Sequence, residues 1–382
     1  MERIKTIANQ GLKAVRQIYR IRKLFSLVEH RKIHDLAKSS DHRVVAMPRK
    51  STFRRYLELL FIDIRWGELS ILYFLQDVDL IGKKITKNYF PYSMFKSMRE
   101  AKNRTKPYDY ICLLQDKLLF ERYFSAAGIQ TVQSIGEMGP GLNCDFGPSG
   151  QGAVLDFFSQ HPDYTCLFCK PRFGIKGKGA FKFEARHGKY YVNNKKAEMN
   201  ELTKLVDSPY LCQPFITQHE DIDRLHPQSI NTLRVITFRH GDNVNVFLTY
   251  LRIGGGGSMT DNNENARAVV GVNQDTGQLN DVGLWVTGDS ISETFAHKTS
   301  NVIFSGCYIP FFSDALDLAR KAHEWTPGLY SVGWDVAFTP DGVVLVEGND
   351  DWGAIFAMWV MRDFKETFLQ ENSKLKVVQN NV

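Results

Sequence analysis

The spacing of apolar and polar residues predicts a mixed chain, helical at both ends and rich in strands between them. Over residues 1 to about 100, apolar positions such as Ile4, Ile7 and Val15 recur at helical spacing with basic residues between them. A second group of helices is predicted at Lys117–Ala127, Phe312–Trp325 and Trp352–Leu369. Apolar runs rich in β-branched residues predict strands that start near Thr165, at Tyr210–Ile216, Ser229–Phe238 and Asn245–Ile253.

The hairpin predicted late in the chain has the clearest pattern. Residues 333–353 read GWDVAFTPDGVVLVEGNDDWG, in which two apolar runs flank the turn sequence Pro340-Asp341-Gly342. With a three-residue loop, Thr339 pairs with Val343, and counting back from that pair places Asp335 directly opposite Glu347.

Asn349 is two residues beyond Glu347 and is therefore predicted to lie on the same face of the hairpin. Two carboxylates so close repel each other unless a cation lies between them or one of them is protonated. Hard oxygen ligands of this kind suit Mg²⁺. The alternative is a solvated acidic face, and spacing alone does not separate the two.

Composition favours a folded protein. The 382 residues allow two or three lobes, and 43% hydrophobic and 12% aromatic residues exclude a disordered chain. No apolar run reaches the ~18 residues of a membrane span, and the N-terminus lacks the core of a secretory signal, so a cytoplasmic location is expected. Six cysteines are too few for a disulfide framework. Cys166 and Cys169 lie on opposite faces of a predicted strand, which argues against a metal pair.

The net charge of +6 is concentrated near the N-terminus. Residues 1–60 contain fifteen Lys or Arg residues and five Asp or Glu residues. Basic residues beside Leu, Ile and Phe suit anionic lipid, a lipid-linked acidic sugar or nucleic acid. A solvated basic helix docked on the body of the protein is the favoured alternative. A peripheral membrane contact comes next, and nucleic acid is the least favoured because no recognition motif accompanies the charge.

Two lysines stand where a phosphate could be bound. Asp116 is the predicted N-cap of the helix that Gly128 ends, and Lys117 lies in its first turn, either at the surface or reaching for a phosphate. Lys170 ends a strand, and a loop of alternating glycine and lysine follows, formed by Gly174, Lys176, Gly177, Lys178 and Gly179. This composition is typical of a phosphate loop, although it is not a Walker A motif and a basic surface hairpin would look the same.

Two further features leave alternatives open. The glycine run from Gly254 to Gly257 predicts a mobile loop that either closes over a substrate or is only a loop tip. His297 lies in a polar stretch, which predicts a surface side chain.

Taken in order, these motifs resemble the ATP-grasp superfamily, the fold of D-alanine:D-alanine ligase, glutathione synthetase and the ribosomal-protein glutamate ligases. The glycine-rich region from Arg252 to Asn262 and the signatures Trp334-Asp335 and Glu347-Gly348-Asn349 are most similar to the sugar-transfer-associated branch. The resemblance covers roughly residues 108–365. It implies an α+β fold in which two α/β lobes, 108–212 and 213–382, clasp ATP after a basic, mainly helical region at 1–107.

The resemblance also implies the cofactors ATP and Mg²⁺ and a role for each matching residue. The two lysines that hold the α- and β-phosphates correspond to Lys117 and Lys170. The loop that folds over the triphosphate corresponds to Gly174, Lys176, Gly177 and Lys178. The hinge that reads adenine and the acid that binds ribose correspond to Gln213, Pro214, Phe215 and Ile216, and to Glu220. The magnesium ligands correspond to Asp335, Glu347 and Asn349. The arginines that meet the γ-phosphate and the acyl phosphate correspond to Arg234 and Arg252.

The chain departs from the pattern at two places. Gly333 stands where D-alanine ligases have a catalytic arginine, so that role falls to Arg234 or Arg252. Asp350 and Asp351 follow Asn349 and either bind an incoming ammonium group, add a metal ligand or cap the final helix, which is the favoured interpretation.

The resemblance implies an ATP-dependent ligase that joins a carboxylate to an amine through an acyl phosphate. Its branch suggests polysaccharide or cell-envelope biosynthesis, with a small-molecule or glycan carboxylate such as a uronic acid and an amine such as an amino acid as substrates. One alternative is a phosphotransferase acting on a hydroxyl, which needs a general base from Asp350, Asp351 or His297. Another is a non-catalytic binding protein regulated by nucleotide.

Overall fold

The computed structural model describes residues 27–39, 41–69, 71–103, 110–138, 166–174, 178–187, 189–197, 209–256, 266–288 and 290–378. The chain forms two compact units. The first consists of residues 1–99 and 353–374, and the second of residues 100–352 and 375–382. The three-part division predicted from the sequence stays a prediction.

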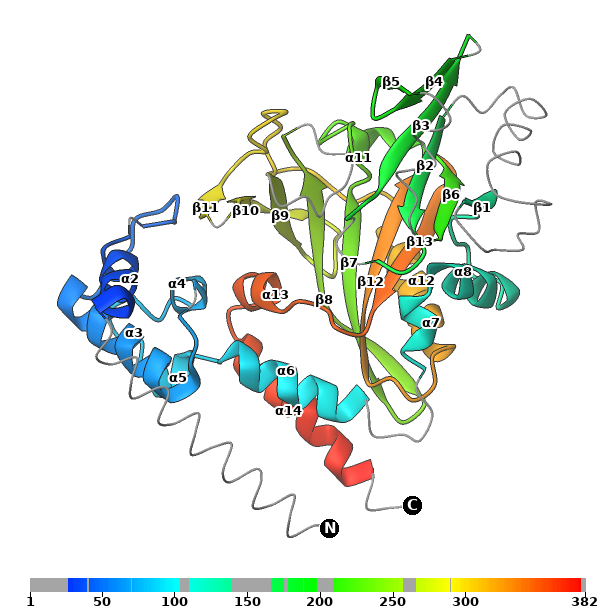
Figure 1. The fold of residues 1–382 in the computed structure, drawn as a ribbon. Helices are drawn as coiled ribbons and strands as arrows, with labels where there is room; N and C mark the ends of the chain where they lie inside the picture. Colours follow the sequence, from blue (N-terminus) through cyan, green and yellow to red (C-terminus); the bar gives the residue numbers. More distant parts are fainter. Residues whose placement is uncertain are drawn as a thin grey trace. The chain divides into compact units, whose positions relative to one another are not determined.

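The first unit is mainly helical in its described part, as the apolar spacing predicts, with one isolated β-bridge between Arg49 and Leu80. Its helices are α2 (Leu27–Lys38), α3 (Thr52–Trp66), α4 (Leu72–Leu75), α5 (Ile85–Asn88), most of α6 (Tyr92–Asn103), α13 (Ile355–Val360) and most of α14 (Phe364–Val378) (Figure 1). Ser51 caps α3 by accepting a hydrogen bond from the Arg54 N–H, and Gly67 ends it at φ 71°. Predicted helical positions before residue 27 lie outside the described residues.

An aromatic cluster holds the two ends of the first unit together. Phe95 packs against Phe364 and Phe368 with ring centroids 5.8 and 5.0 Å apart, and Phe90 lies 5.8 Å from Phe368. Four buried phenylalanine rings form the centre of a hydrophobic core. This packing explains why residues 353–374, far along the chain, belong to the same unit as the N-terminal helices.

The prediction of one closing helix over Trp352–Leu369 is wrong. Two helices, α13 and α14, are separated at Met361, whose backbone is extended at φ −103° and ψ 104°. The break lies immediately before the phenylalanines of α14 that enter the aromatic cluster, so tertiary packing overrides the local helical pattern. The predicted cap by Asp350 or Asp351 is also wrong, because the N-cap of α13 is Ala354 and it makes no side-chain cap bond.

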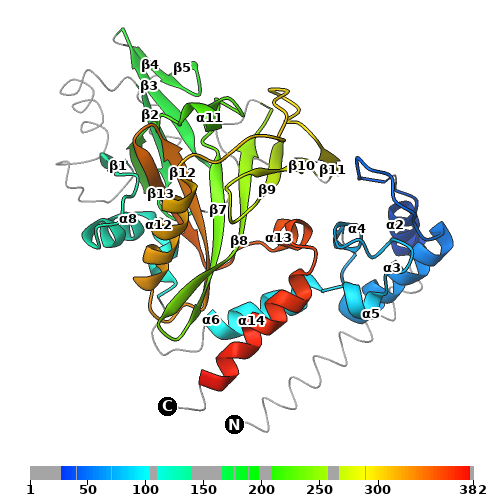
Figure 2. The same cartoon turned by 180° about the vertical axis from the view of Figure 1, so that it is seen from behind.

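The second unit contains two antiparallel sheets (Figures 1 and 2). The six-stranded sheet has the order β1 (Gly136–Met138), β6 (Tyr210–Pro214), β2 (Cys166–Pro171), β3 (Phe181–Arg186), β4 (Lys189–Val192) and β5 (Lys195–Ala197). The seven-stranded sheet has the order β11 (Ser290–Thr294), β10 (Leu279–Thr287), β9 (Arg267–Val272), β8 (Asn243–Gly254), β7 (Thr232–His240), β12 (Ser331–Thr339) and β13 (Gly342–Asn349). The four strands predicted from the sequence are confirmed, and they correspond to β2, β6, β7 and β8.

Helices accompany these sheets. They are α7 (Cys112–Gln115), α8 (Lys117–Ala126), α11 (Glu220–Asp223) and α12 (Phe312–Glu324). Helix α12 lies against one face of the seven-stranded sheet, where Ala315, Ala319 and Ala322 enter the main hydrophobic core. The α8 and α12 predictions are confirmed to within a residue or two at their ends.

The hairpin β12–β13 is confirmed, but its turn differs from the prediction. Thr339 pairs with Gly342, so the loop has two residues rather than three, and Gly342 has a φ of 138° that favours glycine. Farther from the turn, a β-bulge adds Val346 to β13. The two differences cancel, and Asp335 lies opposite Glu347 as predicted.

Within the described ranges, no helix is both long and apolar enough to cross a membrane.

Candidate functional site

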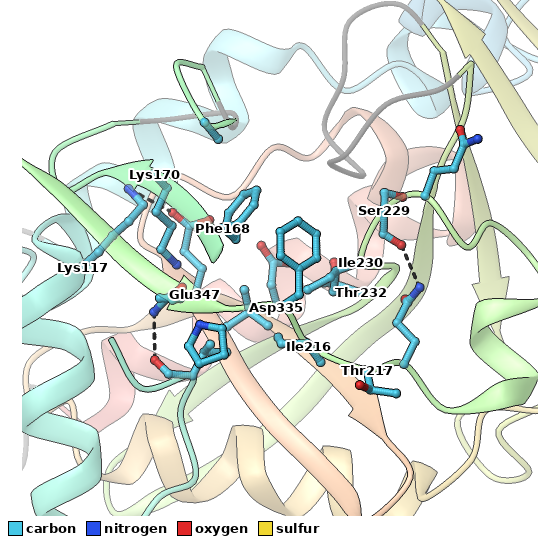
Figure 3. A pocket seen from close by; sticks show the side chains of 18 of the residues that line it. Lys117, Phe168, Lys170, Ile216, Thr217, Ser229, Ile230, Thr232, Asp335 and Glu347 are labelled. Atoms are coloured by element: carbon cyan, nitrogen blue, oxygen red, sulfur yellow. Dashed lines mark hydrogen bonds and ion pairs between the residues drawn. The ribbon is translucent and has the colours of Figure 1, made fainter. Parts of the chain in front are cut away.

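A pocket of about 290 Å³ in the second unit is lined by residues of both sheets (Figure 3). Its size is close to the lower end of the roughly 300–1,000 Å³ typical of small-molecule sites. The lining includes ten residues that the sequence singles out, namely Lys117, Lys170, Gly174, Lys178, Gln213, Pro214, Phe215, Ile216, Asp335 and Glu347. Residues predicted from widely separated motifs therefore come together at one place.

Lys117 and Lys170 form a cationic end of this pocket. Lys117 donates to the Gly174 carbonyl at 2.5 Å, and its Nζ lies 3.9 Å from Oε1 of Glu347. Figure 3 shows Lys117, Lys170 and Glu347 on one side of the pocket and Ser229 on the other. Burial lowers the pKa of Lys170 to about 8, the nearby Lys117 lowers it too, and Glu347 raises it. The site concentrates positive charge where a phosphate chain would neutralise it.

The start of α8 is fixed to the end of β2, which sets the position of both lysines. Asp116 caps α8 by accepting from the N–H groups of Leu118 and Leu119, as predicted. Arg172, just beyond β2, donates to both oxygens of Asp116 at 2.8 and 2.6 Å. Burial alone would raise the pKa of Asp116, but hydrogen bonds from Arg172 and the helix N–H groups hold it below its usual value.

Asp335, at the floor of the pocket, is paired with two arginines. Arg234 donates from Nε to Oδ1 at 2.6 Å and from Nη2 to Oδ2 at 3.1 Å, and Nη1 of Arg252 lies 3.0 Å from both oxygens. All three side chains are buried, with exposed fractions of 3%, 7% and 4% in that order. Burial would raise the pKa of Asp335, but the guanidinium groups of Arg234 and Arg252 lower it below its usual value.

This pairing changes the physical argument for a metal. Repulsion between Asp335 and Glu347 predicted either a cation between them or a protonated carboxyl, and two guanidinium groups already supply positive charge beside Asp335. Among the described residues, no group of three His, Cys, Asp or Glu side chains could hold a metal ion.

A magnesium ion shared with phosphates needs less from the protein. Mg²⁺ is usually bound through one or two carboxylates plus substrate phosphates. Asp335 and the partly exposed Glu347 both line the pocket, and Nδ2 of Asn349 lies 3.4 Å from Oδ2 of Asp335. This donor set fits an ion shared with a ligand and does not fit an all-protein cage.

The remainder of the pocket is suited to a flat apolar group. Phe168 of β2 and Phe215 meet edge to face with ring centroids 5.9 Å apart. Gln213 is buried and donates to the Val132 carbonyl at 2.9 Å, which holds β6 in place. Strand β6 ends at Pro214, so the backbone at Phe215 leaves the sheet ladder inside the pocket wall.

The model of the sugar-transfer associated ATP-grasp family matches residues 97–363, which is more than half of the chain. The chain belongs to this family. The family and the α+β fold predicted from the sequence are therefore confirmed.

Solved structures of other ATP-grasp enzymes are similar to part of this chain. The VanG D-Ala:D-Ser ligase from Enterococcus faecalis is 13% identical, with 70% of this chain and 62% of that chain covered and a TM-score of 0.41. The D-cycloserine synthetase DcsG is 17% identical, with coverages of 69% and 71% and a TM-score of 0.40. N5-carboxyaminoimidazole synthase from Aspergillus clavatus, solved with ADP, is 13% identical, with coverages of 66% and 50% and a TM-score of 0.37.

The chain thus spans half of the length of the Aspergillus clavatus synthase. A carboxyaminoimidazole ribonucleotide synthase from Aspergillus clavatus has also been solved in complex with ATP. The comparison with curated proteins found no match.

Within this ATP-grasp pocket, the structure adds an acid that the sequence argument missed. Glu220 is the exposed first residue of α11 and is not part of the lining. Asp223, at the end of the same short helix, does line the pocket and accepts from Gln218 Nε2 at 3.1 Å. Three acids in one helical turn were the available signal, but only the tertiary structure shows which one faces inward.

Three predicted site residues near Asp335 do not line the pocket, and two others lie outside the described residues. Arg234 and Arg252 lie behind it and reach it through Asp335, and Asn349 lies near the same carboxylate. Lys176 and Gly177 of the glycine-lysine loop, together with Gly257 of the glycine run, lie outside the described residues.

His297 is not a surface residue, so that prediction is wrong. Its side chain is fully buried, with Nε2 2.7 Å from the Gly254 carbonyl and Nδ1 3.0 Å from the Ser300 hydroxyl. Burial lowers the pKa of His297. One partner of the ring, Ser300, is near it in sequence and the other, Gly254, is on a distant strand, which local polarity alone does not reveal.

The glycine at position 333 leaves room for Arg234. A Cβ atom at Gly333 would lie 2.7 Å from Cβ of Trp352 and 3.1 Å from Nη1 of Arg234. Both distances are too short for an unstrained contact. The absence of a side chain at 333 and the presence of Arg234 on the neighbouring strand β7 are therefore linked.

Proposed function

We propose that the protein is an ATP-dependent carboxylate–amine ligase that works through an acyl phosphate and releases ADP. The observation that carries this proposal is that Lys117 and Lys170 line one end of a pocket whose Asp335 is held from behind by Arg234 and Arg252. A triphosphate and a carboxylate substrate together bring several negative charges, which such a cluster would stabilise. The apolar wall around Phe168 and Phe215 suits a purine base.

The reaction follows from the weak electrophilicity of a carboxylate. A carboxylate oxygen of the substrate attacks the γ-phosphorus of ATP, the bond between that phosphorus and the β,γ-bridging oxygen breaks, and ADP leaves. The amine nitrogen then attacks the acyl carbon, the carbon–oxygen bond to phosphate breaks, and the ammonium proton is lost to the released phosphate or to water. No protein side chain has to be the nucleophile.

Each cation has a role in this scheme. Lys117 and Lys170 would bind phosphate oxygens of the nucleotide, and the pKa of about 8 means that Lys170 is mostly charged at neutral pH. Arg234 and Arg252 would stabilise charge on the transferred phosphoryl group. Asp335 holds both guanidinium groups in fixed positions, so they need little reorganisation when that charge develops.

Mg²⁺ would be held by Glu347, Asp335 and Asn349. When bound, it would neutralise phosphate charge and orient the γ-phosphoryl group. Lys117 lies within 3.9 Å of Glu347, so this lysine and the magnesium ion would both contact the phosphates at the same end of the pocket.

The substrate class is the finer part of the proposal. The family name associates this branch with sugar transfer, which supports a role in polysaccharide or cell-envelope biosynthesis, for example joining an amino acid to a uronic acid. The need for ATP implies a cytoplasmic site of action. Acidic glycans would also suit the excess of basic residues in the N-terminal region.

The phosphotransferase alternative lacks a suitable base among the residues suggested for it. His297 is buried, bonded to Gly254 and Ser300, and does not line the pocket. Asp350 and Asp351 do not line it either. A hydroxyl acceptor needs a base within hydrogen-bond reach, whereas a carboxylate does not.

An ADP-release screen tests the proposal. Purified protein is incubated with ATP, Mg²⁺ and pairs drawn from uronic acids, their nucleotide sugars and amino acids, with Lys170→Met and Glu347→Gln as inactive controls. Hydroxylamine should trap an acyl hydroxamate from a ligase and nothing from a phosphotransferase. Release of AMP and pyrophosphate would reject the acyl-phosphate route, and absence of ADP release with every pair would support a non-catalytic role.

A further inference from the structure

Helix α3 of the first unit has an apolar face that is exposed. Phe53, Leu57 and Phe61 are spaced four residues apart, so they lie along one side of the helix. Their exposed fractions are 72%, 46% and 47%. The buried side of the same helix carries Leu59 and Ile62, which pack inside the unit. A helix with apolar residues on both sides buries one side in its own core and leaves the other for a partner.

The exposed side continues onto the next element of the chain. Leu57 and Phe61 line a shallow groove together with Ile85, the first residue of α5, and the basic residues Arg54 and Lys84 lie at its edge. We refer to Phe53, Leu57, Phe61 and Ile85 as the α3 face. Three of these four apolar side chains lie together in one groove, and Phe53 is one helical turn before Leu57.

Exposed lysines flank Ile85 of the α3 face in the sequence, and one of them, Lys84, lines the groove. Lys83, Lys84 and Lys87 are exposed, and in the described part of the chain none of them forms an ion pair with a carboxylate. Glu58, the acid in the groove, is occupied by Lys50 at 2.7 Å and by the Tyr73 hydroxyl at 2.6 Å. The border of the α3 face is therefore basic.

We infer that the α3 face docks on an anionic lipid surface. Aromatic and aliphatic side chains bordered by lysines match the interface of an anionic bilayer, where the rings enter the acyl boundary and the lysines meet the headgroups. This inference does not depend on the proposed activity.

The charge around the α3 face favours a lipid surface over the other possible binding partners. Residues 1–26 contain seven Lys or Arg residues and one Glu, so the lysines beside the α3 face would repel that segment. A second copy would bring the same lysines against each other. An anionic bilayer attracts both the α3 face and the basic N-terminal segment, and it needs no membrane-spanning helix.

Co-sedimentation with vesicles tests this inference on the full-length protein. Vesicles of phosphatidylcholine with phosphatidylglycerol should bind the protein, and vesicles of phosphatidylcholine alone should not. The variant Phe53→Ser, Leu57→Ser, Phe61→Ser should lower the partition coefficient by at least about tenfold, because the exposed rings and the leucine no longer leave water. Each of Lys83→Ala, Lys84→Ala and Lys87→Ala should lower it roughly fivefold at low salt.

A matched control uses exposed apolar residues of the second unit. Phe295→Ser with Ile303→Ser removes side chains that are 48% and 61% exposed, and it should leave vesicle binding unchanged. Circular dichroism of each variant verifies that the helices are intact. Unchanged binding of the serine variant of α3 would overturn the inference and leave the basic N-terminal segment as the lipid contact. The inference would also be overturned if the wild-type protein does not bind the anionic vesicles but binds an acidic protein through the α3 face.

Discussion

Replacing Asp335 by asparagine should destabilise the second unit strongly. The substitution preserves volume but removes the negative charge that two buried guanidinium groups share. Arg234 and Arg252 would then be two uncompensated cations with very little access to water. Because one neutral amide oxygen cannot replace two charged acceptors, the structure predicts a loss of stability rather than a local change in activity alone.

The magnitude follows from what buried ion pairs do when one partner is lost. Removing one partner of a buried pair costs about 3–5 kcal/mol of unfolding free energy, since the remaining charge keeps its desolvation penalty. We expect a value in that range for Asp335→Asn. The matched control is Glu347→Gln on the neighbouring strand, where the carboxylate is partly exposed and its nearest cation lies 3.9 Å away. Such a pair contributes under about 1 kcal/mol.

Urea unfolding at pH 7, followed by tryptophan fluorescence, measures both variants. Trp334 is buried beside Asp335 in the sequence, so its emission reports on this part of the sheet. The double variant Asp335→Asn, Arg252→Met removes one of the uncompensated cations and should recover part of the loss. Equal costs for Asp335→Asn and Glu347→Gln, or strictly additive costs in the double variant, would refute the reasoning.

The difference should also depend on pH with a definite sign. The pKa of Asp335 in the folded protein lies below the ordinary value of an aspartate, about 3.8, so the carboxylate stabilises the fold at every pH above that value. As pH falls below 3.8, the unfolded chain takes up a proton first and the advantage of the wild type shrinks. The gap between wild type and Asp335→Asn should therefore be constant from pH 7 to about 5 and should close at lower pH.

Three further predictions concern binding and packing. ATP affinity, measured by calorimetry, should fall as pH rises above about 8, by about tenfold per pH unit at most, because Lys170 loses its proton, and Lys170→Arg should abolish that dependence. Asp223→Asn should weaken ATP binding by about tenfold if this carboxylate meets the ribose, whereas Glu220→Gln should change it less than about twofold. Gly333→Ala should lower the free energy of unfolding in urea by about 1–3 kcal/mol, because the added methyl group has no room beside Trp352 and Arg234. An unchanged free energy of unfolding would contradict this steric argument.

Local patterns in the sequence predicted the parts of this protein that depend on neighbouring residues. Strand β6, helix α8 with its Asp116 cap, and the β12–β13 hairpin each follow from periodicity, capping or turn residues. The pairing of Asp335 with Glu347 was also predicted, although the argument assumed the wrong turn. A two-residue turn and a bulge at Val346 gave the same pairing, because the buried face of each strand restricts the register.

Structural features that depend on contacts with distant residues were not predicted correctly from the sequence. His297 is surrounded by polar residues in sequence, yet its ring is buried. Its Nε2 atom forms a hydrogen bond with the Gly254 carbonyl on another strand, which satisfies the buried ring. The helix predicted over Trp352–Leu369 is divided where Phe364 turns toward Phe95. Neither contact can be read from the local sequence, because each partner lies tens or hundreds of residues away.

The amino-acid sequence by itself indicated an ATP-grasp chain and singled out Lys117, Lys170, Asp335 and Glu347, which line one pocket. The tertiary structure alone decided how these charges are paired. Two arginines from β7 and β8 neutralise Asp335, and Asp223 rather than Glu220 faces the cavity. The physical reason is that electrostatic pairing falls off steeply with distance, so it depends on which strands become neighbours and not on the order of residues along the chain.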